Sequence, residues 1–198
     1  MITVIDNFLP SEVFQAAHNE TKNCDFKAVT SKMIKAGFQW PGVRSSALKT
    51  INPLLDSIIA NNIVSYQLPF TNGPFNYTQF AHLRVEEDNE SDFIHTDTGD
   101  DFAWLLYLSE TNLDSGTKFY TEDEYEHNFV RFVQNRFIIF DCRIKHMAFN
   151  NYGKDLNDGR LTIKQAIVYF NITHMYLDKK RDPKVSSLYH SLVIISTD

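Results

Sequence analysis

The sequence predicts a mainly β protein, a jelly roll with N-terminal helices packed on one sheet. Short apolar segments separated by polar turns follow one another from about residue 76 to residue 172, the pattern of a sandwich or barrel. Two helix-like segments precede them. Sixteen Phe and nine Tyr suit a β-rich core, and 43% hydrophobic residues in a chain of 198 are enough for one sizeable core. We therefore expect a single domain over residues 1–198.

The N-terminal part, residues 1–75, is predicted to form a helical support. A short strand over Ile2 to Phe8 leads into a first helix with Ser11 as a reasonable N-cap. Residues 35–46 contain Gly37, Pro41 and Gly42 and indicate a loop. Asn52 and Pro53 then have the pattern of an N-cap followed by proline at the first helical position. The apolar spacing after them predicts one buried helix face formed by Leu54, Leu55, Ile58 and Ile59.

The jelly-roll core is predicted over residues 76–172, followed by a C-terminal extension over residues 173–198. Its alternating and apolar segments indicate eight strands. They lie near Asn76–Val85, Asp92–His95, Phe102–Ser109, Thr117–Tyr120, Phe129–Phe132, Phe137–Asp141, His146–Phe149 and Leu161–Ile172. The extension begins with a charged run, and its apolar end is expected to pack back onto the domain.

Composition narrows the function classes. The net charge of −6 does not indicate a nucleic-acid partner, because that affinity comes mainly from Lys and Arg on phosphates. The two cysteines, Cys24 and Cys142, are far apart and indicate neither a disulfide framework nor a zinc knuckle. No signal peptide and no run near the ~20 apolar residues of a membrane span is evident, so we expect no membrane partner. A cytoplasmic location fits these features best.

The candidate metal ligands are His95, Asp97 and His146. A two-residue step on a strand returns to the same face, so His95 and Asp97 can reach one ion, and the turn sequence after them places the pair at a strand end. His146 follows an apolar strand and would complete a set of two histidines and one carboxylate, which leaves positions open on Fe(II). Taken singly, the histidines could equally be a surface residue beside a turn and a residue buried against its own backbone.

Three side chains near the second histidine are candidates for holding a carboxylate-bearing ligand. Arg160 opens an apolar strand, and its guanidinium could hold a carboxylate through two parallel hydrogen bonds. Thr162 shares its face, and so does Lys164, a rival cation that would act as a point charge. The phenol of Tyr107 could donate to the same carboxylate or could simply belong to the core.

Taken together in this order, these motifs resemble the Fe(II)/2-oxoglutarate-dependent oxygenases, in particular their prolyl-4-hydroxylase-like branch. The resemblance runs from Val4 to Phe170. It implies a double-stranded β-helix that binds Fe(II), with 2-oxoglutarate and O₂ as co-substrates. It also implies roles for the candidates: His95, Asp97 and His146 would bind iron, Arg160 would pair with the distal carboxylate of 2-oxoglutarate, and Thr162 and Tyr107 would support it. The segment between His146 and Arg160 is longer than is usual in this family, which keeps Lys164 as a rival to Arg160.

The resemblance further implies a dioxygenase that hydroxylates a substrate side chain and releases succinate and CO₂. A prolyl or other protein side chain is the substrate expected for this branch, and a small molecule is the other option. The alternative is a non-catalytic jelly-roll binding module with a structural metal. Arg160 distinguishes the two, because a module that only binds a metal needs no carboxylate clamp. A cupin-like dioxygenase would rely on more histidine ligands than this motif contains.

Overall fold

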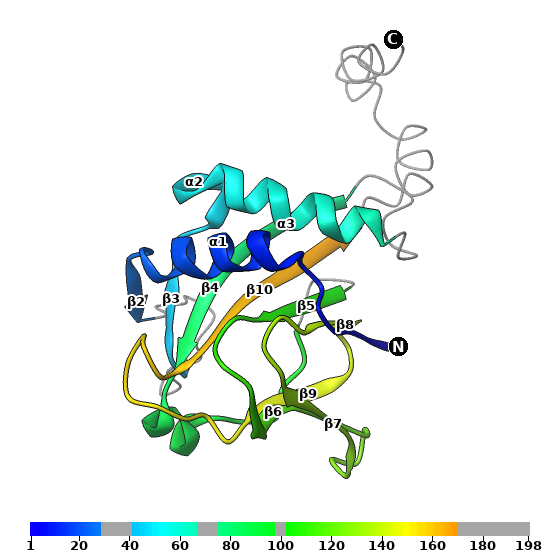
Figure 1. Ribbon diagram of the computed structural model, residues 1–198. Coiled ribbons are helices and arrows are strands. Elements are labelled where there is room, and N and C mark those ends of the chain that lie inside the picture. The colour runs from blue at the N-terminus through cyan, green and yellow to red at the C-terminus, as the bar shows by residue number, and fades with distance from the viewer. Residues whose placement is uncertain (29–40, 67–74, 98–101, 170–198) are drawn as a thin grey trace, which may run out of the picture.

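Two antiparallel sheets form the body of the protein, as shown by a computed structural model that describes residues 1–28, 41–66, 75–97 and 102–169 (Figure 1). The seven strands of the large sheet lie in the order β1 (Ile2–Ile5), β8 (Phe137–Asp141), β5 (Phe102–Tyr107), β10 (Arg160–Tyr169), β4 (Phe75–Arg84), β3 (Val43–Ser45) and β2 (Phe26–Ala28). The small sheet has the order β7 (Glu126–Phe132), β6 (Asn112–Tyr120) and β9 (Lys145–Phe149).

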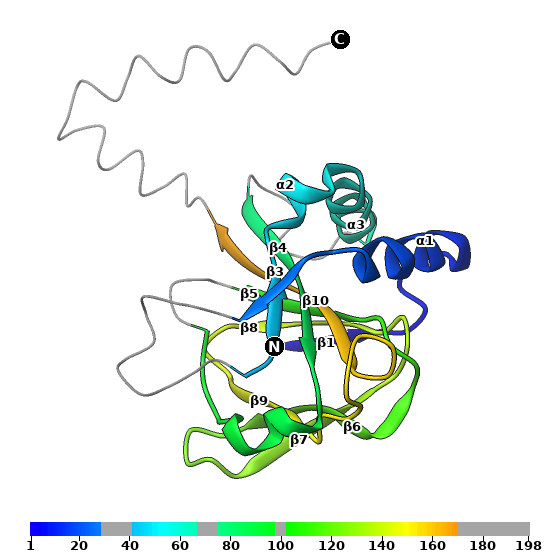
Figure 2. The ribbon, with the colours of Figure 1, turned by 90° about the vertical axis from the view of Figure 1, so that its left-hand side faces the viewer.

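Helices cover the outer face of the large sheet (Figure 2). They are α1 (Ser11–Lys22), α2 (Leu48–Ile51) and α3 (Pro53–Ser65). Their buried side chains pack with those of the strands in one apolar cluster, which includes Phe14, Leu48 and Ile59 from the helices and Trp104, Phe137 and Leu161 from the sheet. This layer confirms the predicted jelly roll with helices packed on one sheet.

A second apolar cluster lies between the two sheets. Tyr107 and Phe140 reach it from the large sheet, and Phe119 and Phe132 reach it from the small sheet. The rings of Tyr107 and Phe132 stack with centroids 4.1 Å apart. This cluster fills one part of the space between the sheets with apolar side chains.

Strand β10 is central to the large sheet and divides its side chains between the two layers. Leu161 and Ile163 belong to the cluster under the helices, whereas Arg160, Thr162 and Lys164 line a cavity on the opposite face. This division follows from the two-residue period of a strand. One strand therefore supplies both apolar packing and the polar residues of the interior.

Some predictions for the N-terminal part are confirmed and others are wrong. Asn52 caps α3, because its side-chain oxygen accepts a hydrogen bond from the amide of Leu55 at 3.1 Å, and Pro53 is the first helical residue. Ser11 is not the N-cap: it is the first residue of α1, and Pro10 occupies the capping position without a side-chain hydrogen bond. Leu54 is 71% exposed, so the buried face of α3 is instead formed by Leu55, Ile59 and Ile63.

The predicted strands differ from those of the structure at several places. Residues 92–95 form no strand beyond a single bridge at His95, and a 3₁₀ helix over Glu86–Ser91 precedes them. The predicted loop contains β3, which extends the sheet beside β4, and β2 pairs with β3 in turn. β6 begins at Asn112, ahead of the predicted strand over Thr117–Tyr120. Residues 35–40 of the predicted loop and residues 170–198, which include the predicted extension, lie outside the described residues.

In the described part of the chain, none of the helices is long and apolar enough to cross a membrane.

Candidate metal centre

The two candidate histidine ligands are direct neighbours through their backbones. His95 forms an isolated antiparallel bridge with His146 on β9, in which the His95 amide donates to the His146 carbonyl at 3.0 Å and the reverse bond is 2.8 Å. Their rings lie with centroids 4.4 Å apart. Because the bridge is made by main-chain groups, it brings the two imidazoles together without any contribution from the side chains.

Both imidazoles use the same nitrogen for a structural hydrogen bond. Nδ1 of His95 lies 3.0 Å from the carbonyl oxygen of Phe93, and Nδ1 of His146 lies 2.9 Å from that of Ile144. A carbonyl oxygen can only accept, so Nδ1 carries the proton in each ring and Nε2 presents its lone pair. This is the tautomer that a metal-binding histidine needs when a backbone carbonyl orients it.

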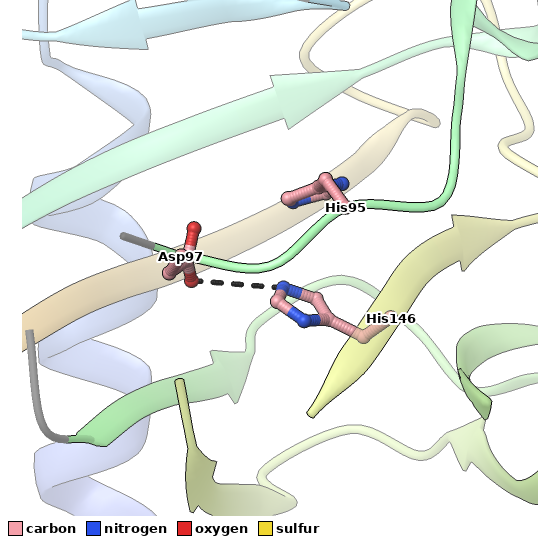
Figure 3. Close-up of side chains that lie close together, drawn as sticks. All are labelled: His95, Asp97 and His146. Carbon is pink, nitrogen blue, oxygen red and sulfur yellow. Dashed lines mark ion pairs between the residues drawn. The ribbon is translucent and has the colours of Figure 1, made fainter. Parts of the chain in front are cut away.

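Asp97 completes the group, as Figure 3 shows, with its carboxylate directed toward His146. Its Oδ2 lies 3.6 Å from Nε2 of His146, and both atoms are buried without a hydrogen-bond partner among the described residues. One ligand atom from each of the three residues lies within 4.8 Å of the others. The amide of Asp97 donates to the carbonyl of Cys142 at 3.0 Å, which holds the backbone at this point.

The electrostatics favour neutral imidazoles beside an ionised carboxylate. Burial lowers the pKa of His146 and His95, and nearby positive charge lowers both further. Burial alone would raise the pKa of Asp97, but Lys164 and the two histidines outweigh it and lower that pKa. Two neutral histidines and one anion are the protonation states in which these side chains bind a divalent ion.

A polar cavity adjoins the three candidate ligands. His95, His146, Arg160, Thr162 and Lys164 line it, so the structure brings these sequence-predicted candidates together. Thr162 donates to the carbonyl of His82 at 3.3 Å. Lys164 lies at the ligand end, where its Nζ donates to Oδ1 of Asp97 at 3.0 Å.

Arg160 lies at the other end of this cavity and is only 3% exposed. One terminal nitrogen of its guanidinium is 3.3 Å from both the carbonyl of Gly116 and the hydroxyl of Thr117, and the group stands over the rings of Tyr107 and Phe132. Its Nε is buried without a hydrogen-bond partner among the described residues.

Tyr107 does not line the cavity itself. Its hydroxyl lies 2.7 Å from that of Thr117, which in turn contacts Arg160. Burial raises the pKa of Tyr107, so the phenol keeps its proton. Tyr107 therefore contacts the guanidinium of Arg160 directly through its ring and indirectly through Thr117.

Two residues of β4 line the same cavity without having been proposed as site residues. Arg84 lies opposite Arg160 in the strand register, and His82 lies opposite Thr162. Arg84 is ion-paired with the buried Asp92, whose carboxylate also accepts from Asn151 at 3.1 Å. The sequence signal for both was their alternation with Ala81 and Leu83 at the end of β4.

Sequence comparison identifies no relatives: no family model and no curated protein matches the chain. Solved structures do resemble it. A Trichoplax adhaerens prolyl hydroxylase, solved with a hypoxia inducible factor peptide, is 15% identical and has a TM-score of 0.63 over 84% of this chain and 83% of its own. A Pseudomonas putida prolyl-4-hydroxylase is 15% identical, with a TM-score of 0.55 over 85% and 92%. HygX from Streptomyces hygroscopicus, solved with nickel, 2-oxoglutarate and hygromycin B, is 13% identical, with a TM-score of 0.60 over 85% and 83%.

At these identities the likeness establishes the fold. The double-stranded β-helix expected from the resemblance to Fe(II)/2-oxoglutarate oxygenases is confirmed.

Proposed function

We propose that this protein is an Fe(II)- and 2-oxoglutarate-dependent dioxygenase. The observation that carries the proposal is the pairing of two features in one cavity. Three ligand atoms from His95, Asp97 and His146 converge at one end. A buried guanidinium, whose Nε has no hydrogen-bond partner among the described residues, lies at the other. An ion and a dianionic co-substrate that bridges the two ends would satisfy both.

The three ligands fit Fe(II) by their chemistry. Two imidazoles and one carboxylate on one side of the ion form the facial triad of non-haem Fe(II) oxygenases. Bound iron would supply the oxygen chemistry, in which 2-oxoglutarate is oxidised to succinate and CO₂ and one oxygen atom passes to the substrate. The chain's own contribution is to orient the imidazoles through Phe93 and Ile144 and to exclude water through burial.

Of the three cations that line the cavity, Arg160 is the best candidate for holding the distal carboxylate of 2-oxoglutarate. Lys164 is engaged with Asp97, and Arg84 is neutralised by Asp92. Arg160 has no carboxylate within ion-pair distance among the described residues, and its fork suits bidentate binding. Thr162, two residues along the same face of β10, and Tyr107, beneath the guanidinium, would support the clamp.

For the primary substrate we propose a protein side chain, with proline as the first candidate. The prolyl hydroxylase solved with a peptide supports this choice, whereas HygX, solved with hygromycin B, shows that the fold also accepts a small molecule. Candidate peptides and small molecules should therefore be screened together, with succinate as the common product.

The decisive test combines binding and turnover. Anaerobic addition of Fe(II) and 2-oxoglutarate should produce the weak visible charge-transfer band of an iron–keto acid complex, and air should then yield succinate. His146→Ala should abolish both signals, whereas His127→Ala, which removes an exposed histidine of β7, should preserve them. Metal binding with neither band nor succinate in the unmodified protein would favour the non-catalytic binding module.

A further inference from the structure

We propose that Lys164 is a positioning residue that holds Asp97 as a one-oxygen metal ligand and so keeps a coordination position open for the keto acid. The inference rests on the proposed function and gives Lys164 a role in it that differs from clamping 2-oxoglutarate. It predicts that Lys164 weakens metal binding while strengthening keto-acid binding.

The geometry divides the two oxygens of Asp97 between two partners. Oδ1 accepts from Nζ of Lys164 at 3.0 Å, and Oδ2 lies 3.6 Å from Nε2 of His146. The side chains of Lys164 and Asp97 are only 15% and 14% exposed, so water competes weakly for this contact. With Oδ1 held by the ammonium, Oδ2 is the oxygen that faces the other ligands.

The backbone on both sides of this contact is fixed. Lys164 lies on β10, which is paired with β4 on one side and with β5 on the other. Asp97 is held by the hydrogen bond that its backbone amide donates to the carbonyl of Cys142. Lys164 also lies four residues from Arg160, about 13 Å along a strand, so the two cations serve opposite ends of the cavity.

Removing the ammonium has two consequences of opposite sign. The metal ion would no longer be repelled by a nearby cation, and Asp97 would attract it with its full charge, so metal affinity should rise. Oδ1 would also become available as a second donor to the ion. A carboxylate that binds through both oxygens occupies a position that the keto acid needs, so affinity for 2-oxoglutarate should fall.

The test uses Co(II), whose visible absorption reports coordination number and which is stable in air. In Lys164→Met we expect Co(II) to bind severalfold more tightly, the Co(II) spectrum to change, and 2-oxoglutarate to bind the Co(II)-loaded protein about tenfold more weakly, within the range for changes around metal ligands. The matched control is Lys118→Met, because Lys118 is 18% exposed and also ion-paired, with Glu126 on the small sheet. It should leave both affinities unchanged.

Two further variants separate hydrogen bonding from charge. Lys164→Gln keeps a donor without the charge, and partial recovery of 2-oxoglutarate affinity would show that positioning contributes. Lys164→Arg keeps both the hydrogen-bond donor and the charge, so it should recover most of the affinity for 2-oxoglutarate. A loss of both affinities in Lys164→Met would indicate general disruption, and unchanged values would also overturn the inference. If the unmodified protein binds no Co(II) or Fe(II), the proposed function itself fails.

Discussion

Asp97 is the only carboxylate in the described cluster of three metal-ligand candidates, and its side chain is 14% exposed. Without it, two neutral imidazoles would remain beside the ammonium of Lys164, an arrangement that disfavours a divalent ion. We therefore expect Asp97→Ala to abolish 2-oxoglutarate turnover and to weaken Fe(II) binding by at least about tenfold. Equilibrium metal titration and succinate assays measure the two effects. Asp114→Ala, at an exposed position of β6, should change neither, and unaltered turnover in Asp97→Ala would refute the ligand assignment.

Arg160 differs from the other cations of the cavity because it has no carboxylate partner among the described residues. Truncating one member of a buried, hydrogen-bonded charge pair costs about 2–5 kcal/mol. Arg160→Ala should therefore raise the dissociation constant for 2-oxoglutarate by about 30-fold or more. Calorimetric titration of the Co(II)-loaded protein measures the change, with Arg143→Ala as a surface control whose side chain is 87% exposed. If Lys164 variants lost affinity for 2-oxoglutarate and Arg160→Ala did not, the clamp would be assigned to Lys164 instead.

At the scale of elements, a side-chain cap fixes the start of helix α3. Asn52 accepts from the amide of Leu55 and reaches Glu20 of α1 with its own amide at 3.0 Å. Loss of an N-cap side chain costs about 1 kcal/mol. Asn52→Ala should lower the free energy of unfolding by that amount in urea denaturation. Asn61→Ala, at an exposed position inside α3, should be neutral or slightly stabilising, and equal destabilisation by both variants would contradict the cap.

At the scale of the whole molecule, burial of neutral histidines makes stability depend on pH. Burial is the largest cause that lowers the pKa of His82, His95 and His146 in the folded protein, whereas unfolded histidine titrates near 6.5. Below that pH the unfolded chain binds more protons than the folded one. Stability is therefore fully present above about pH 6.5 and is lost as the pH falls toward the folded pKa values, at up to about 1.4 kcal/mol per pH unit for each histidine.

Urea unfolding of the metal-free protein between pH 7 and pH 5 measures this dependence. His82→Gln should make the free energy of unfolding depend less steeply on pH. The reduction should equal the contribution of one histidine, because a glutamine in this place does not titrate. His127→Gln, at an exposed position of β7, is the control variant. A flat profile over this range would show that the histidines titrate normally in the folded protein.

Local covalent geometry explains which features the sequence alone could predict. The two-residue period of a strand placed Arg160, Thr162 and Lys164 on one face of β10, and the Asn52–Pro53 pattern located the start of α3. The spacing of His95 and Asp97 likewise indicated a shared ligand set. These inferences need only neighbouring residues, whose relative directions are set by the backbone itself.

Tertiary structure decided what depends on partners distant in the sequence. The face of α3 that is buried was set by packing on the large sheet, so Leu54 is exposed. The pairing of His95 with His146 depends on strand register, which long-range burial selects. The same packing brings Lys164 to Asp97 rather than to the far end of the cavity. The sequence thus determined which chemical groups the centre contains, and the fold decided which of them touch, because burial and register act across the whole chain.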